Sequence, residues 1–334
     1  MHDRGDGAFV TFSSGIGSMP GEDARDYDEA LRFVVAELSM PYLPELPGRG
    51  AHANMTGRAL AVVAELGADL QPAGWRLTGS GGGVDQRRAK SLLDQDLDAL
   101  EEHTQGYEGP LKVQVAGPWT LAATVERPRG DRLLADHGAR RELAQALAAG
   151  LEEHVADVRR RVPGASLIVQ VDEPALPAVL AAKIPTASGF GRHRSVDAPG
   201  ATPALSNVFE AIRGAGATPV AHCCASDAPI GLLLGAGASG VSVDLSLLSA
   251  EGHDAVAGAL EAGHWVLLGV VPTVASAVTA KQVVERVERF LDVVGLDPTE
   301  RLAVTPTCGL ASAGPVWART ALSLAVESAG HLAG

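Results

Sequence analysis

The sequence predicts an α/β protein built as a single (β/α)8 barrel, or TIM barrel, over residues 1–334. Three observations support this fold class. Short apolar stretches alternate with longer stretches of helical periodicity, which is typical of a parallel sheet built from βαβ units. Eight strand candidates occur, and no Gly-x-Gly-x-x-Gly motif follows the first one to indicate a dinucleotide fold. No linker divides the chain.

Apolar runs bounded by glycine, proline or polar residues define the predicted strands. Residues 112–116 alternate between apolar and polar side chains, whereas residues 167–171 are strongly apolar. Residues 41–50 contain three prolines and two glycines and are therefore predicted to be a loop. The eight predicted strands are residues 9–12, 68–72, 112–116, 167–171, 218–221, 241–243, 265–270 and 302–304.

Apolar residues at helical spacing define the predicted helices, and Asp23 is suited to cap the first of them. Within residues 94–98 three aspartates resemble part of a calcium loop. Ala99 stands where that loop requires glycine, so a solvated helix face is predicted instead. The predicted helices are residues 23–38, 54–66, 130–161 in two parts, 204–214, 228–234, 251–262, 280–294 and 314–329.

Composition and charge exclude several classes of function. Hydrophobic residues make up 46% of the chain and aromatic residues only 4%, so the core must consist mainly of Ala, Val and Leu. The net charge of −13 argues against nucleic-acid binding, which depends on clustered Lys and Arg. The start of the chain is polar, and no run of about eighteen apolar residues occurs, so we expect a cytoplasmic protein without a membrane span.

The three cysteines predict metal binding or catalysis rather than a disulfide framework. His222, Cys223 and Cys224 follow one another directly after an apolar strand. In an extended chain His222 and Cys224 point to one side and Cys223 to the other. Asp244 and Cys308 each follow a later predicted strand. Together His222, Cys224, Asp244 and Cys308 would make a credible Zn²⁺ site, because imidazole, thiolate and carboxylate groups all suit this ion.

Other unusual polar groups also lie at or just past the carboxyl ends of predicted strands, the face on which barrels of this kind carry their active sites. Carboxylates such as Asp172 at the end of a buried strand are costly unless they have a function. Trp75 and Trp119 would offer planar surfaces to a second substrate. The full set is Ser18, Gln71, Trp75, Trp119 and Asp172, together with the four metal candidates.

These segments together resemble the catalytic barrel of the cobalamin-independent methionine synthase family, within a wider group that includes uroporphyrinogen decarboxylase. Residues 15–20 resemble the family's loop after the first strand, and residues 171–176 resemble its Asp-Glu-Pro-Ala-Leu motif. Residues 222–224 resemble its His-x-Cys zinc pair, and residues 305–310 resemble the segment with its last zinc cysteine. The length matches the barrel alone, without the N-terminal duplicate domain of the long enzymes.

The resemblance implies a zinc-dependent methyltransferase that transfers a methyl group to the zinc-activated thiol of homocysteine to give methionine. It implies that Asp172 is the catalytic residue that holds the amino group of the substrate, and that Ile16, Gly17 and Ser18 bind the same substrate. The donor would be a methylfolate or a methylated corrinoid protein. The partners are therefore small molecules or a carrier protein, with no nucleic acid and no membrane.

The chain departs from the family pattern in three places. Asp244 stands where the family usually has a glutamate ligand, and Arg49 and His52 occupy the stretch that normally supplies a glutamate for the amino acid. Residues 177–178 are Pro and Ala where an acidic residue is expected. Three other functions therefore remain open: a zinc alkyltransferase for another small thiol, a metal-free decarboxylase of the porphyrin type, and a non-catalytic relative without zinc.

Overall fold

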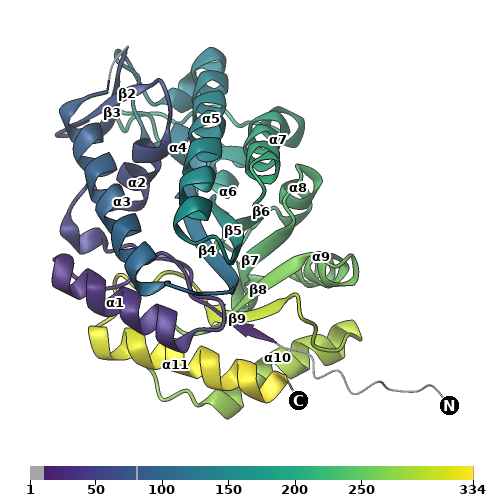
Figure 1. The fold of residues 1–334 in the computed structure, drawn as a ribbon. Helices are drawn as coiled ribbons and strands as arrows, with labels where there is room; N and C mark the ends of the chain where they lie inside the picture. The colour runs from purple at the N-terminus through teal and green to yellow at the C-terminus, as the bar shows by residue number, and fades with distance from the viewer. Residues whose placement is uncertain (1–10, 80–81, 334) are drawn as a thin grey trace.

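Seven parallel strands form a curled sheet at the centre of the protein, and helices surround it (Figure 1). The computed structural model describes residues 11–79 and 82–333. The strand order is β1-β9-β8-β7-β6-β5-β4, and every neighbouring pair is parallel. These strands are β1 (Phe12–Ser13), β4 (Gly109–Ala116), β5 (Ala165–Asp172), β6 (Thr218–Cys223), β7 (Gly240–Asp244), β8 (Trp265–Val271) and β9 (Leu302–Pro306).

Eleven α-helices occur among the described residues. In the part of the chain that the structure covers, none of them has both the length and the apolar character that crossing a bilayer requires. They are α1 (Ala24–Glu37), α2 (Met55–Val62), α3 (Val84–His103), α4 (Pro118–Thr124), α5 (His137–Arg161), α6 (Leu176–Leu180), α7 (Ala198–Gly214), α8 (Ile230–Gly235), α9 (Ala250–Glu261), α10 (Ala280–Val294) and α11 (Pro315–Leu332).

The side chains inside the curled sheet change from apolar to polar along the strands. Ile168, Val220 and Leu267 pack together in a cluster separate from the main core. Residues an even number apart on a strand share a face, so Asp172 lies on the same face as Ile168, and His222 on the same face as Val220. Asp172 and His222 are register partners on β5 and β6. Apolar residues therefore fill the amino ends of the strands and polar groups collect at their carboxyl ends.

The prediction that residues 68–72 form a barrel strand is wrong. The segment is β2 (Gly67–Gln71), which pairs antiparallel with β3 (Gly74–Gly79) in a two-stranded sheet apart from the central one (Figure 1). Only Pro72 and Ala73 separate the two strands. Two residues make a hairpin turn, whereas a parallel crossover needs a dozen or more, so this pair can only be antiparallel.

The edge strands β1 and β4 are joined by residues 40–43, of which residues 41–43 were predicted to be part of a loop. The Met40 N–H donates to the Ser13 carbonyl at 3.0 Å, and the Lys112 N–H donates to the Pro41 carbonyl at 2.9 Å. Pro41 has no N–H to contribute to a ladder, and the segment pairs with β4 through an isolated bridge. The sheet thus has seven regular strands where eight were predicted, and the residues before position 11 lie outside the described part.

The predicted helices are confirmed, with changes at their ends. The Asp23 side chain caps α1 by accepting hydrogen bonds from the N–H groups of Arg25 and Asp26, both at 2.9 Å. The helix predicted for residues 54–66 ends at Val62 instead. Glu65 has φ +59°, in the left-handed region, so the chain turns away before the predicted end.

Asp96 is buried, which corrects the prediction of a solvated face for residues 94–98. Arg49 donates to both of its oxygens, at 2.8 and 2.7 Å, and Arg58 contacts the same carboxylate. Arg58 Nε also lies 3.4 Å from a carboxylate oxygen of Glu45. One buried network of charges therefore connects α3 to α2 and to the irregular stretch that precedes α2.

Candidate functional site

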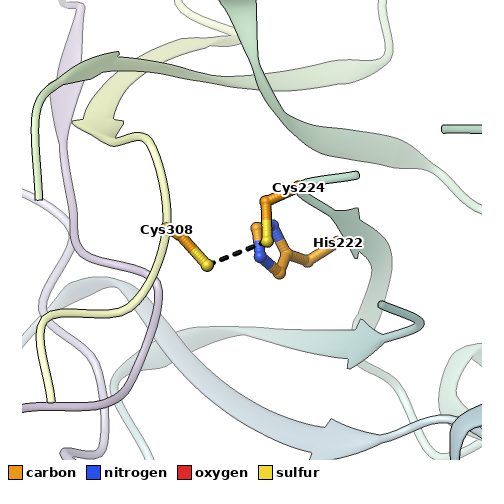
Figure 2. A group of neighbouring side chains, drawn as sticks. All are labelled: His222, Cys224 and Cys308. Carbon is orange, nitrogen blue, oxygen red and sulfur yellow. Dashed lines mark hydrogen bonds between the residues drawn. The ribbon is translucent and has the colours of Figure 1, made fainter. Parts of the chain in front are cut away.

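His222, Cys224 and Cys308 lie together at the carboxyl ends of β6 and β9 (Figure 2). Each offers one ligand atom, and these atoms all lie within 4.8 Å of one another. The two sulfur atoms are 2.8 Å apart although the residues are separated by 84 positions in the sequence. The structure therefore brings three of the four predicted metal ligands to one place.

The His222 ring is held by β7. Its Nδ1 atom lies 3.1 Å from the Ser242 carbonyl oxygen and 3.0 Å from the Ser242 hydroxyl. A carbonyl oxygen only accepts hydrogen bonds, so Nδ1 carries the proton and donates it. In the neutral ring this leaves the lone pair on Nε2 for a metal ion, the usual way in which a second contact fixes a ligating histidine.

The two thiols of this group are electrostatically unequal. A hydrogen bond from Cys224, together with the nearby His222, lowers the pKa of Cys308 to about 4, and the same hydrogen bond raises the pKa of Cys224. Cys223 faces the opposite side of β6, where burial raises its pKa to about 11. One imidazole nitrogen and two sulfurs fit a zinc ion, which binds thiolates and leaves a fourth position for another ligand.

Asp244 does not belong to this group of three. Its Oδ1 atom accepts hydrogen bonds from the Ser246 N–H at 2.9 Å and from the Ser246 hydroxyl at 2.6 Å. These contacts cap a short 3₁₀ helix, Leu245–Leu247. The carboxylate is thus engaged in the turn after β7, and its role as a fourth ligand stays a prediction.

Two buried carboxylates interact with one another near this site, and one of them, Asp172, is the register partner of His222. Asp172 accepts a hydrogen bond from Gln170 Nε2 at 2.7 Å, and its burial raises its pKa to about 7. Glu45 accepts one from Gln114 Nε2 at 3.1 Å, and burial raises its pKa too. Repulsion from the Glu45 carboxylate adds to the upward shift of the Asp172 pKa. Glu45 was not among the predicted site residues; its signal is a single acidic residue between Leu43 and Leu46 in a stretch rich in proline.

The predicted substrate loop lies against these groups. The Ile16 carbonyl accepts hydrogen bonds from Lys112 Nζ and from Gln170 Nε2, both at 2.8 Å. Lys112 is fully buried. The loop is therefore fixed to β4 by the Lys112 side chain and to β5 by the Gln170 side chain.

Gly17 and Ser18 continue this loop toward the cysteines. The Gly17 carbonyl accepts from the Glu45 N–H at 3.0 Å, and the Ser18 carbonyl accepts from the Leu310 N–H at 2.8 Å. A Cβ atom on Gly309, next to Cys308, would lie 2.1 Å from the Ser18 hydroxyl oxygen. The loop thus lies between the carboxylates on one side and the Cys308 segment on the other.

Trp75 and Trp119 pack in different places. Trp75 lies in the β2–β3 hairpin with its ring edge-on to His52, at 5.8 Å between centroids. The Trp119 indole N–H donates to the Ala201 carbonyl of α7 at 3.1 Å, and the Arg140 guanidinium lies 5.5 Å from its ring. Their role in binding a second substrate stays a prediction.

Glu173, next to Asp172, ties β5 to α4. Its carboxylate accepts hydrogen bonds from the Trp119 N–H at 2.9 Å, the Thr120 N–H at 2.8 Å and the Thr120 hydroxyl at 2.8 Å. Burial raises its pKa to about 7. Neighbouring residues of a strand point to opposite faces, so Asp172 faces the interior of the sheet while Glu173 holds the start of a helix.

Comparisons with known proteins point to one family. The sequence model described as "Cobalamin-independent synthase, Catalytic domain" matches residues 106–331. A B12-independent methionine synthase from Shewanella sp. W3-18-1, solved with selenomethionine, is similar in structure with a TM-score of 0.64 and 14% identity, over 96% of this chain and 97% of that chain. A GH20 catalytic module of pneumococcal exo-β-D-N-acetylglucosaminidase is similar with a TM-score of 0.51 and 8% identity, over 96% and 85%. These two likenesses show the fold alone, and a search of curated proteins found no match.

Proposed function

This chain belongs to the family of cobalamin-independent synthase catalytic domains, and from that membership we propose that it is a zinc-dependent methyltransferase that converts homocysteine to methionine. The observation that carries the proposal is the convergence of His222, Cys224 and Cys308 from two distant segments onto one point. All three residues lie within the part of the chain that matches the family. A buried pair of inert cysteines would not need a histidine ring oriented toward them.

His222, Cys224 and Cys308 would hold the zinc ion, with Asp244 as the proposed fourth and exchangeable ligand. When bound, zinc lowers the pKa of a coordinated thiol so that it is a thiolate at neutral pH. In the overall reaction the homocysteine sulfur forms a bond to the methyl carbon and the bond from that carbon to the donor nitrogen breaks. The nitrogen keeps the electron pair and gains the proton that the thiol loses.

The remaining residues of the site would bind and orient homocysteine. Asp172 and Glu45 are buried acceptors suited to its ammonium group. Ser18, which lies against the glycine that follows Cys308, would hold its carboxylate. This arrangement places the amino-acid end of the substrate at the loop of residues 16–18 and its sulfur toward the cysteines.

We propose a methylfolate as the methyl donor, which the family supports. A methylated corrinoid protein finds no support in the comparisons and is the alternative that the assay must exclude. The same assay, run with homocysteine and with a small thiol that lacks the amino group, separates a methionine synthase from another zinc alkyltransferase.

The test combines metal analysis with transfer of a labelled methyl group. We expect wild type to carry about one zinc ion per chain, as a site with three protein ligands does, and to label homocysteine from methylfolate. Cys308→Ser should lose most of the metal and the activity. Cys223→Ala is the matched control, because this thiol faces away from the group, and it should keep both. Wild type without zinc, or Cys308→Ser with full zinc and activity, would contradict the proposal.

We also propose that residues 40–43 take the place of the eighth strand and close the barrel. Two facts support closure: this segment is hydrogen-bonded to β1 on one side and to β4 on the other, and Met40 packs in the interior cluster with Ile168 and Val220. Closure would bring Glu45, two residues after this segment, to the rim of the barrel.

A further inference from the structure

Two glutamines on neighbouring strands have matching surroundings inside the sheet. Gln114 of β4 and Gln170 of β5 are register partners, and the two residues are 6% and 0% exposed. Gln170 donates from Nε2 to the Ile16 carbonyl at 2.8 Å and to Asp172 Oδ1 at 2.7 Å. Its amide nitrogen thereby connects the substrate loop to a carboxylate of the candidate site.

Gln114 makes the corresponding pair of contacts. Its Nε2 donates to the Leu43 carbonyl at 2.6 Å and to Glu45 Oε1 at 3.1 Å. A Cβ atom on Gly17 would lie 2.8 Å from the Gln114 amide carbon, so this side chain packs directly against the substrate loop. Each glutamine therefore uses both N–H groups, one for a backbone carbonyl and one for a carboxylate.

The oxygen of each side-chain amide accepts no hydrogen bond from the described residues. Gln114 Oε1 and Gln170 Oε1 are buried, and neither has a hydrogen-bond partner within the described part of the chain. Buried acceptors without a partner are rare in folded proteins because desolvation without a hydrogen bond is costly. Two such oxygens on register partners, whose amides contact Glu45 and Asp172, indicate a ligand that brings N–H donors.

We propose that Gln114 and Gln170 select an amino-acid thiol by its primary ammonium group. Each would hold one carboxylate, Glu45 or Asp172, in a fixed position and offer its free Oε1 atom to the ammonium. A primary ammonium has three N–H donors and a positive charge, which match amide oxygens combined with carboxylates. The inference rests on the proposed function, since it names the part of the acceptor that the site recognises.

A thiol without an ammonium group would leave these acceptors buried and unpaired. Sites built to hydrogen-bond a substrate group reject analogues that lack the group far more strongly than apolar pockets reject a missing methylene. The site should therefore exclude small mercapto acids and thiol sulfonates, which separates this chain from an alkyltransferase for such compounds.

The test measures binding of two unreactive ligands to the full chain supplied with zinc. L-methionine carries the ammonium, and 4-(methylthio)butanoate has the same skeleton without it. We expect wild type to prefer methionine by at least about 100-fold. Gln114→Met and Gln170→Met, which keep the length of the side chain but remove its polar atoms, should each weaken methionine binding by about 10- to 100-fold. Binding of 4-(methylthio)butanoate should change little.

Gln145→Met is the matched control, because Gln145 is exposed on α5, and it should bind both ligands as wild type does. Thermal unfolding and zinc content show whether each variant is folded. Should a Met variant not fold, Gln114→Asn and Gln170→Asn keep the amide but shorten the side chain, and they should show the same selective loss.

The inference is overturned if wild type binds the two ligands equally, or if the Gln114 and Gln170 variants weaken both ligands to the same extent. Methyl transfer to homocysteine by wild type would still support the proposed function in that case. Conversely, ammonium selectivity in a protein that holds no zinc and transfers no methyl group would contradict the proposed function and leave this inference standing.

Discussion

Asp96→Asn tests the buried charge network that connects α3 to the stretch before α2. The Asp96 side chain is 2% exposed, and its partners Arg49 and Arg58 are 8% and 4% exposed. Asparagine keeps the shape but removes the charge, so two guanidinium groups would stay in the interior without their shared carboxylate. Removing one partner of a buried pair typically costs about 3–5 kcal/mol. We expect a loss of at least about 3 kcal/mol in the free energy of unfolding.

Asp94→Asn is the control on the same helix. Asp94 forms a surface ion pair with Lys90 at 3.4 Å, and its side chain is 47% exposed. Exposed pairs contribute about 0–1 kcal/mol, so this variant should unfold within about 0.5 kcal/mol of wild type. Urea denaturation followed by circular dichroism measures both variants, and equal slopes would show that the midpoint shift reports stability.

A domain's whole stability is about 5–15 kcal/mol, so the expected loss for Asp96→Asn is a large share of it. If Asp96→Asn is no less stable than Asp94→Asn, water or a rearranged partner compensates Arg49 and Arg58, and the network does not stabilise the fold. The reasoning from burial would then be refuted at this site.

Three further changes have defined outcomes. Gly150→Ala should lower the free energy of unfolding by about 1–3 kcal/mol, because a Cβ atom there would lie 1.8 Å from the Val62 carbonyl oxygen; an unchanged melting temperature would contradict this. Gly258 lies in α9, and a Cβ atom there would meet nothing within 4 Å. Gly258→Ala should therefore raise the free energy of unfolding by about 0.5–1 kcal/mol, and a lower melting temperature would contradict this. Burial in the folded protein raises the pKa of Glu173 from 4.5 to about 7, so the folded state holds this proton more tightly than the unfolded state. The contribution of Glu173 to the free energy of unfolding should therefore fall as the pH rises from about 4.5 through 7. Denaturation of Glu173→Gln at several pH values should show a weaker decline over that window, and an equal decline would assign it to other groups.

The metal candidates at the carboxyl ends of β6 and β9 could be found in the sequence because the signal is local. An apolar strand followed at once by His222 and Cys224 fixes which side chains share a face, since alternation along a strand has a period of two. Cys308 follows another apolar strand, and parallel strands of one sheet present their carboxyl ends together. Local pattern and a single topological rule were sufficient for these three residues.

Asp244 shows the limit of that reasoning. It also ends a predicted strand, but Ser246 supplies both an N–H and a hydroxyl to its carboxylate. Short polar side chains often bind the backbone two residues on, and this competing local interaction decides where the side chain points. The strand pattern gives the position of the Cα atom but not the outcome of that competition.

The misplaced second strand and the missed Glu45 have one physical cause. Alternation in residues 68–72 suits a hairpin as well as a barrel. The prolines and glycines of residues 41–50 predict a loop, since proline cannot donate to a ladder. Hydrogen bonds to both neighbouring strands nevertheless hold residues 40–43 in place. They are non-local contacts between β1, residues 40–43 and β4, which no window of sequence contains. A proline-rich stretch is thus positioned by the strands on either side of it, and this placement brings the glutamate that follows to Gln114 and Gly17.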